Sequence, residues 1–263
     1  MITFRKSDWL WLVLLALLAG YAYYFYASHR PCASPISYKI GTVDPRFGVS
    51  QSQFQDDISQ ASDIWESGVG KSLFAYDPRG NVTINLVYDT RQQTTQAESK
   101  LRTTIDQGAQ NAKSAKAAYL ASQAQYLAAR QEYEAELAQG RPDEATRQRV
   151  NTLAQQTNTL IDQYNALVDD VNQKVQTFNN DGLAGTQFEE GVYVSDNQGR
   201  RIDIYQFDTQ TAFIRVIAHE LGHALGLDHN NNPDSIMNPV NQSTSMTLSP
   251  DDLQALKTEC GLH

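Results

Sequence analysis

The sequence has no cluster of lysine and arginine side chains. It holds 21 lysine and arginine residues against 30 aspartate and glutamate residues, which gives a net charge of -9. A nucleic-acid partner requires clustered basic side chains that neutralise phosphates, so we expect no such partner. The hydrophobic and charged fractions, 41% and 19%, are ordinary for a folded protein and do not indicate disorder.

Cysteine is scarce as well, since only Cys32 and Cys260 occur. In an oxidising compartment, an even pair is most simply one disulfide. Such a bond between these two residues would close a loop that contains most of the chain.

Glycine is almost missing from residues 91–180, where glutamine, alanine, threonine and asparagine dominate. Apolar residues in the second half of this segment fall alternately three and four apart, which is typical of a coiled-coil seam. They are Val150, Leu153, Thr157, Leu160, Tyr164, Leu167, Val171 and Phe178. In the first half, Tyr119, Tyr126 and Tyr133 recur every seven residues beside Leu120, Leu127 and Leu137.

Gly140 and Pro142 separate these two halves and supply a helix stop and a new helix start. We therefore predict an antiparallel coiled-coil hairpin over residues 91–180, about 50 Å long at 1.5 Å per residue. Two interpretations of it remain open: a solvated spacer, or an arm that binds a protein partner.

The segment from Trp9 to Tyr26 is long, apolar and uncharged. It is just long enough to cross a bilayer, so we predict a transmembrane anchor at residues 9–27 and a linker at 28–36. Arg5 and Lys6 place residues 1–8 in the cytoplasm by the positive-inside rule, and the rest of the chain outside it. The alternative is a cleaved signal peptide with Gly20-Tyr21-Ala22 as its cleavage site, which would make the protein secreted.

One stretch contains the residues that indicate a catalytic function: His219-Glu220-Leu221-Gly222-His223-Ala224-Leu225-Gly226-Leu227-Asp228-His229. On a helix, His219 and His223 share one face and can both bind one Zn²⁺. Gly226 permits the sharp turn that would bring His229 back as a third ligand. Three protein ligands leave one position open, as in catalytic zinc sites, and Glu220 stands where a general base is needed.

This motif resembles that of the metzincin clan of metalloproteases, and it matches the clan's pattern at all five fixed positions. Ser235-Ile236-Met237-Asn238-Pro239 is similar to the clan's Met-turn, the tight turn beneath the zinc. Within the clan the chain looks most like the matrixins, because Leu248-Ser249-Pro250-Asp251-Asp252-Leu253 is similar to the opening of their last helix. The resemblance is weak over residues 36–90 and good over 186–262.

The matrixin resemblance implies an α+β fold with a twisted mixed sheet, an active-site helix and a C-terminal helix. Residues 37–90 and 181–263 would form this catalytic domain, with 91–180 inserted. It further implies that Met237 supports the zinc from below and that Pro239, Val240 and Asn241 form a wall of the substrate pocket. The loops that hold structural zinc and calcium in many matrixins are missing here, so only the catalytic zinc is supported.

The same resemblance bears on the cysteines. In matrixins the start of the catalytic domain packs against the last helix, which supports a Cys32–Cys260 disulfide. The alternative is that the Cys32 thiolate blocks the zinc, as the matrixin propeptide cysteine does. The order Arg30-Pro31-Cys32 departs from the family's Pro-Arg-Cys-Gly, and the linker leaves no room for a propeptide.

Local patterns predict the elements around the motif. We expect strands at 37–40 and 81–88 with an amphipathic helix at 51–66 between them. Residues 188–194 and 201–207 are typical of a hairpin, and Asp208 or Thr209 would cap the helix that carries the histidines.

The sequence thus predicts a membrane-anchored zinc endopeptidase in which Glu220 activates water. An alternative from another class is a membrane-tethered binding or assembly protein that works through the hairpin and has an inactive zinc site. A third hypothesis is a peptidase that cleaves only a neighbouring membrane protein that docks on the hairpin.

Overall fold

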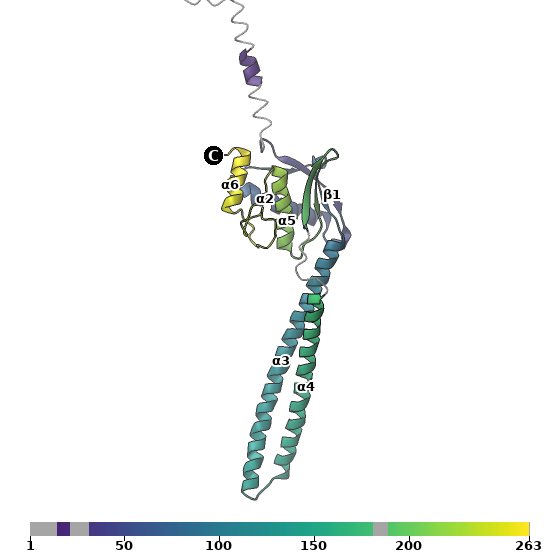
Figure 1. Cartoon of the computed structure of the whole chain (residues 1–263), viewed down its shortest axis with the longest axis vertical. Coiled ribbons are helices and arrows are strands. Elements are labelled where there is room, and N and C mark those ends of the chain that lie inside the picture. Colours follow the sequence, from purple (N-terminus) through teal and green to yellow (C-terminus); the bar gives the residue numbers. More distant parts are fainter. Residues whose placement is uncertain (1–14, 22–31, 181–188, 263) are drawn as a thin grey trace, which may run out of the picture. The chain divides into compact units, whose positions relative to one another are not determined.

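The computed structural model describes residues 15–21, 32–180 and 189–262. They divide into two compact units, one made of Met1–Gln93 and Phe188–His263 and the other of Thr94–Gln187. The described elements of the first unit are a mixed sheet and helices, which confirms the α+β class (Figure 1).

Five strands form the sheet in the order β2-β1-β3-β5-β4. These strands are β1 (Ile36–Val43), β2 (Phe74–Tyr76), β3 (Val82–Leu86), β4 (Gly191–Asp196) and β5 (Gly199–Ile204). β1, β2, β3 and β5 are parallel, and β4 pairs antiparallel with β5 as the predicted hairpin. β2, which the sequence analysis did not predict, makes the outer parallel pair with β1.

Helices α2 (Gln51–Val69) and α5 (Gln210–Leu225) pack against the sheet (Figure 1). α2 begins at Ser50, whose hydroxyl accepts a hydrogen bond from the Gln53 N–H at 3.1 Å. Four apolar side chains on one face of α2 are in the core, as expected of an amphipathic helix: Phe54, Ile58, Ala61 and Trp65. The helix runs three residues past its predicted end, because Gly70 in the left-handed conformation stops it.

The last helix, α6 (Pro250–Cys260), is joined to the start of the first unit by a Cys32–Cys260 disulfide. The Lys71 ammonium donates a hydrogen bond to the Cys32 carbonyl, which adds a second tie at the same place. The predicted pairing is therefore confirmed. Cys32 is engaged in this bond, so the structure does not support the alternative in which its thiolate blocks the zinc.

We expect a mass spectrum of an unreduced digest to contain the Cys32 peptide joined to the Cys260 peptide. Replacing both cysteines by alanine should lower the free energy of unfolding by about 2–5 kcal/mol, because the bond restricts a long loop of the unfolded chain. Thermal unfolding of the two proteins measures this difference. Two free thiols in material folded under oxidising conditions would contradict the assignment.

The second unit is built from two long helices, α3 (Thr90–Ala138) and α4 (Glu144–Asn180). They run antiparallel and side by side, with the hydroxyls of Ser122 and Thr157 2.8 Å apart between them (Figure 1). Near the turn, Arg149 donates a hydrogen bond to the Glu132 carboxylate at 3.1 Å. The predicted helical hairpin is thus present, while its supercoiling and its status as an insertion in the family stay predictions.

The first turn of α3 belongs to the first unit. The Gln92 side chain donates to the Phe207 carbonyl at 3.1 Å and accepts from the Phe207 N–H at 2.9 Å, and Gln92 is buried. The second unit accordingly begins at Thr94 rather than at the predicted residue 91.

The seam between the helices contains the predicted residues and, on the α3 side, small side chains that were not predicted. Tyr119, Tyr126 and Tyr133 are half-buried as expected, and so are the predicted α4 positions, with Thr157 fully buried. The leucines next to these tyrosines in the sequence lie outside the seam: Leu120, Leu127 and Leu137 are 49%, 49% and 48% exposed. Small side chains take the inner positions instead, namely Ala112, Ser122 and Ala129.

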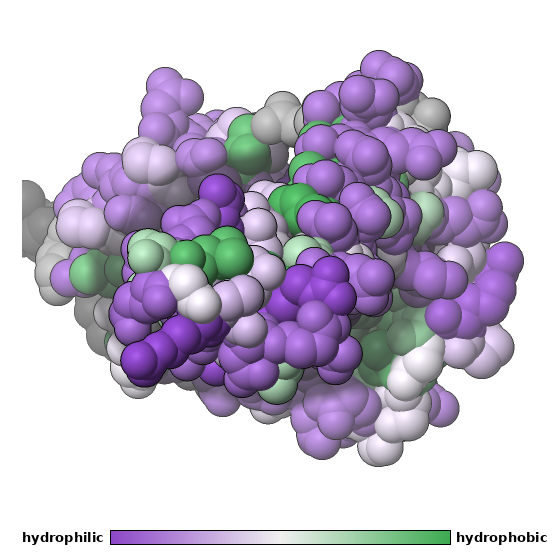
Figure 2. Space-filling view, turned by 90° about the horizontal axis from the view of Figure 1, so that it is seen from below, coloured by the Kyte–Doolittle hydropathy of each residue, from purple (hydrophilic) through white to green (hydrophobic). Residues whose placement is uncertain are grey.

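The predicted anchor at 9–27 and the segment 1–8 lie mostly outside the described residues. Residues 15–21 are described and helical. Within the described part of the chain, no helix is both long and apolar enough to cross a membrane. On the face shown in Figure 2, hydrophilic residues predominate and hydrophobic ones form small separate groups.

Candidate metal centre

Helix α5 carries two of the three candidate ligands, and its sequence explains where it starts and stops. The Thr209 hydroxyl caps it by accepting from the Ala212 N–H at 3.1 Å. Four apolar side chains on its inner face lie in the core: Phe213, Ile217, Leu221 and Leu225. Gly226 ends the helix with φ 97°, a left-handed conformation that glycine adopts without strain. The chain turns there and brings His229 back toward the helix.

His219, His223 and His229 converge through their Nε2 atoms. Each of the three Nε2–Nε2 distances is 3.1 Å. Among the described residues, these histidines are the group of three or more His, Cys, Asp and Glu side chains that could hold a metal. Zn–N bonds of about 2.0–2.1 Å in a tetrahedral site give N–N separations of about 3.3 Å, so the three atoms are spaced for one zinc ion.

The protonation of the rings fits a metal as well. His219 Nδ1 donates to the Ile236 carbonyl at 2.7 Å, and His223 Nδ1 donates to the Leu227 carbonyl at 2.8 Å, since a carbonyl oxygen can only accept. Burial lowers the pKa of His219 to about 4 and also lowers that of His223, so both rings are neutral at pH 7. Their Nε2 atoms then carry lone pairs that face each other, and a bound cation removes this repulsion.

Glu220 lies beside this group with its carboxylate in the protein interior. Its side chain is 4% exposed, and burial raises its pKa to about 8 despite a hydrogen bond from the Tyr193 backbone. The Oε2 atom is buried and has no hydrogen-bond partner among the described residues. Buried polar atoms are rarely left unsatisfied, so this oxygen is placed for a water or substrate group.

Met237 packs against helix α5 at Gly222. It is fully buried, and Gly222, between the two helical histidines, allows its sulfur to approach α5. A Cβ atom at Gly222 would come within 2.3 Å of the Met237 sulfur and 2.8 Å of Trp65, so no larger residue fits there without movement. Trp65 also donates its indole N–H to the Ala218 carbonyl at 2.7 Å, which fixes α2 against α5.

Asp252 is a residue of this site that the sequence analysis missed. It is fully buried at the start of α6, and its carboxylate accepts from the N–H groups of Ile236 at 2.9 Å and Met237 at 3.2 Å. It also accepts from the Ser235 hydroxyl and from Asn230 Nδ2, the latter at 3.3 Å. One carboxylate therefore holds both the Met-turn and the residue next to His229. The available signal was the capping pair Ser249 and Asp252, which the structure contains.

The predicted wall residues lie in the segment after the Met-turn: Pro239 is exposed, and Val240 and Asn241 are half-buried. Asn241 donates to the Glu190 carboxylate at 2.8 Å and accepts from the Arg215 guanidinium at 3.0 Å. Burial raises the pKa of Glu190 to about 7. Polar contacts thus connect the side chain of Asn241 to α5 and to the residue before β4.

Arg215 was also missed. It is buried on α5 and donates to the carbonyls of Ser235, at 3.0 Å, and Ser245 in addition to Asn241. Its signal in the sequence was a single charge within the apolar run Phe213-Ile214-Arg215-Val216-Ile217. The guanidinium joins the helix of the histidines to the Met-turn and to the wall segment.

A family model of the matrixins matches residues 32–259 of this chain. The chain belongs to the matrixin family. This confirms the predicted resemblance and places the chain in a family of zinc metalloendopeptidases.

Individual matrixins match over shorter segments. The chain is 36% identical to matrilysin of Felis catus over 80 residues, which is 29% of this chain and 27% of that protein. It is 34% identical to matrilysin of Rattus norvegicus over 80 residues, again 29% of this chain and 27% of that protein. It is 47% identical to stromelysin-2 of Rattus norvegicus over 55 residues, or 19% of this chain and 12% of that protein. The matched segments thus span about a quarter or less of these relatives.

Proposed function

We propose that this chain is a zinc-dependent endopeptidase. The observation that carries the proposal is the convergence of three histidine Nε2 atoms, 3.1 Å apart, beside a buried carboxylate with an unsatisfied oxygen. The matrixin family implies zinc, and the three ligands His219, His223 and His229 are of the type and number that catalytic zinc sites use.

When bound, zinc acts as a Lewis acid toward the scissile carbonyl and lowers the pKa of a water. Beside the positive charge of a bound zinc ion Glu220 would be ionised, and its carboxylate would take a proton from the attacking water and deliver it to the leaving amine. The backbone carbonyls of Ile236 and Leu227 hold the His219 and His223 rings in the tautomer that presents Nε2. Met237 would support this arrangement from the core, and Pro239, Val240 and Asn241 would bound the pocket for a substrate side chain.

Removal of zinc tests this proposal directly. The full chain, purified in detergent, should cleave members of a fluorogenic peptide library. A chelator should abolish the cleavage, and added Zn²⁺ should restore it, because the histidines alone do not activate water. Zinc bound without cleavage of any peptide would favour the alternative in which the chain is a binding or assembly protein.

We further propose that residues 9–27 anchor the protein in a membrane, with residues 1–8 in the cytoplasm and the catalytic unit on the other side. The support is the apolar run from Trp9 to Tyr26 and the basic pair Arg5 and Lys6 before it. An oxidising compartment on that side agrees with the Cys32–Cys260 disulfide.

A further inference from the structure

The outward face of α3 between residues 117 and 128 is apolar. This stretch contains no charged residue. Eight of its side chains are exposed, and all except Gln125 are alanine or leucine: Ala117, Ala118, Leu120, Ala121, Ala124, Gln125, Leu127 and Ala128. An exposed helix face of a soluble unit is normally polar, and contiguous apolar surface indicates a binding partner.

The hairpin itself does not need these side chains. α3 packs on α4 through small residues such as Ala112, Ser122 and Ala129, and Gly108 allows Val171 to approach the helix closely. Leu120 and Leu127 are each 49% exposed, although leucine is among the residues most often buried. The pairing of α3 with α4 therefore leaves about half of the surface of each leucine uncovered.

Lys113 borders this face at one end and Glu134 at the other, next to the further exposed charges Lys116 and Arg130. Lys113, Leu120, Leu127 and Glu134 follow one another at intervals of seven residues, which places them on one side of the helix. All four are exposed. In an antiparallel pair of such helices, Leu120 would face Leu127, and each Lys113 would face a Glu134. The face is thus complementary to a second copy of itself.

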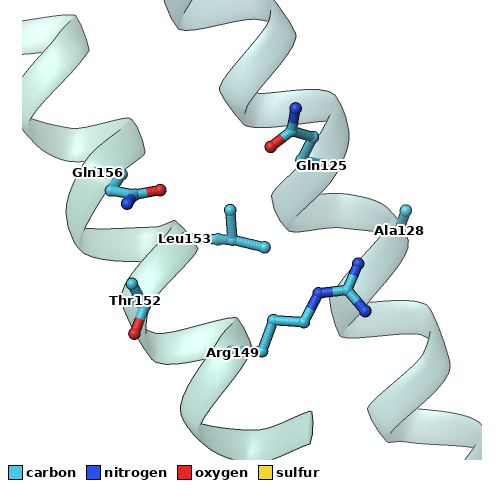
Figure 3. Close-up of a pocket in the computed structure, with 6 residues that line it drawn as sticks. All are labelled: Gln125, Ala128, Arg149, Thr152, Leu153 and Gln156. Carbon is cyan, nitrogen blue, oxygen red and sulfur yellow. The ribbon is translucent and has the colours of Figure 1, made fainter.

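A groove between α3 and α4 lies beside this face. It has a volume of about 440 Å³ and is lined by Gln125, Ala128, Arg149, Thr152, Leu153 and Gln156. Leu153 points from α4 into the space between the helices, and Arg149 reaches toward α3 (Figure 3). Ala128 belongs to both the groove and the apolar face, so the apolar surface continues from the α3 face toward Leu153.

We propose that two copies of this chain associate through residues 113–134 of α3, which pair antiparallel. The alanines of the face permit close approach of the two helices, and a two-fold axis between residues 123 and 124 brings the leucines and the opposite charges together. Glu134 also has an exposed ion pair with Arg130 on its own helix at 2.8 Å. Exposed pairs of this kind are weak, so this pair does not prevent a contact with Lys113.

Sedimentation velocity of the full chain in detergent tests the proposal. The wild-type chain should dimerise reversibly, and Leu120→Glu should weaken the dimer by about tenfold or more, because it places a charge against Leu127 of the partner. Leu137→Glu is the matched control: this leucine is 48% exposed on the same helix but on a different side, and its change should alter the dissociation constant less than about twofold. Circular dichroism verifies that both variants stay helical.

Charge reversal tests the antiparallel register. Lys113→Glu and Glu134→Lys should each weaken the dimer by about fivefold, and the double variant should recover most of the loss, because it restores both opposite-charge contacts. A wild-type chain that stays monomeric up to about 100 µM would overturn the proposal and leave this face to another protein. A dimer that Leu120→Glu leaves intact, or a double variant without recovery, would overturn it as well.

Discussion

The variant Glu220→Gln should lose at least about a hundredfold in peptide hydrolysis and keep its zinc, because removal of a general base usually costs this much. Glutamine has nearly the same shape and cannot take a proton from water at neutral pH. The three histidines and the backbone carbonyls that orient them are untouched by the change. Turnover and zinc content are measured on the same sample.

Glu189→Gln is a suitable control, since it makes the same chemical change at an exposed residue whose charge raises the pKa of Glu220, and so separates loss of a nearby charge from loss of the base. Its hydrolysis should stay within about twofold of the wild type. If Glu220→Gln retained more than about a tenth of wild-type activity, the role of Glu220 as base would be rejected. Loss of zinc together with activity would instead point to a structural role for the carboxylate.

The sequence predicts best those features that depend on residues close together along the chain. The zinc motif is one case: the i, i+4 spacing of His219 and His223 and the turn at Gly226 are local, and both appear in the structure. The cap at Thr209 is local as well. A pattern of a few residues therefore determined the helices and their ends.

What the sequence does not predict depends on partners far apart in the chain. β2 has only three residues, and it forms a strand because β1 pairs with it. The contacts of Asp252 with Ile236 and Met237 span 16 and 15 residues and require the last helix to be in place. The outward position of the α3 leucines was not predicted for another reason: both faces of this helix carry apolar or small residues, so hydrophobic spacing alone does not distinguish them.

The second large effect is expected for Asp252→Ala. This change removes the carboxylate that accepts from the N–H groups of Ile236, Met237 and Ser249. Buried N–H groups without a partner cost about 1–3 kcal/mol each, so we expect the free energy of unfolding to fall by roughly 3–5 kcal/mol. Urea denaturation measures this loss.

Asp251→Ala is the matched control, because Asp251 is the exposed neighbour in the same helical turn and, within the described part of the chain, accepts only from Asn232 Nδ2, at 2.8 Å. This change should lower the free energy of unfolding by no more than about 1 kcal/mol, mainly because it removes a favourable interaction with the helix dipole and this exposed contact. Equal destabilisation by the two changes would contradict the special role of Asp252.

The pH dependence of stability gives a separate check. Burial alone would raise the pKa of Asp252, but hydrogen bonds from Ser235, Ile236 and Ser249 outweigh it and lower the pKa. A carboxyl whose pKa is lowered on folding stabilises the protein above its unfolded pKa, about 4, and this contribution is lost as the pH falls through the folded value. The difference in stability between wild type and Asp252→Asn should therefore be largest near neutral pH and shrink in acid.

Asp252 should also affect the metal centre without touching it. The Asp252 carboxylate accepts from the Ile236 N–H, and the carbonyl of the same Ile236 accepts from His219 Nδ1. The Asp252 carboxylate also accepts from Asn230, the neighbour of His229. Groups that orient metal ligands in this way typically contribute 10–100-fold to affinity, so we expect zinc binding by Asp252→Asn to weaken by about that factor at a temperature where the variant is folded. Competition with a fluorescent chelator measures the affinity. Unchanged zinc binding in a folded but destabilised variant would limit Asp252 to the stability of the Met-turn.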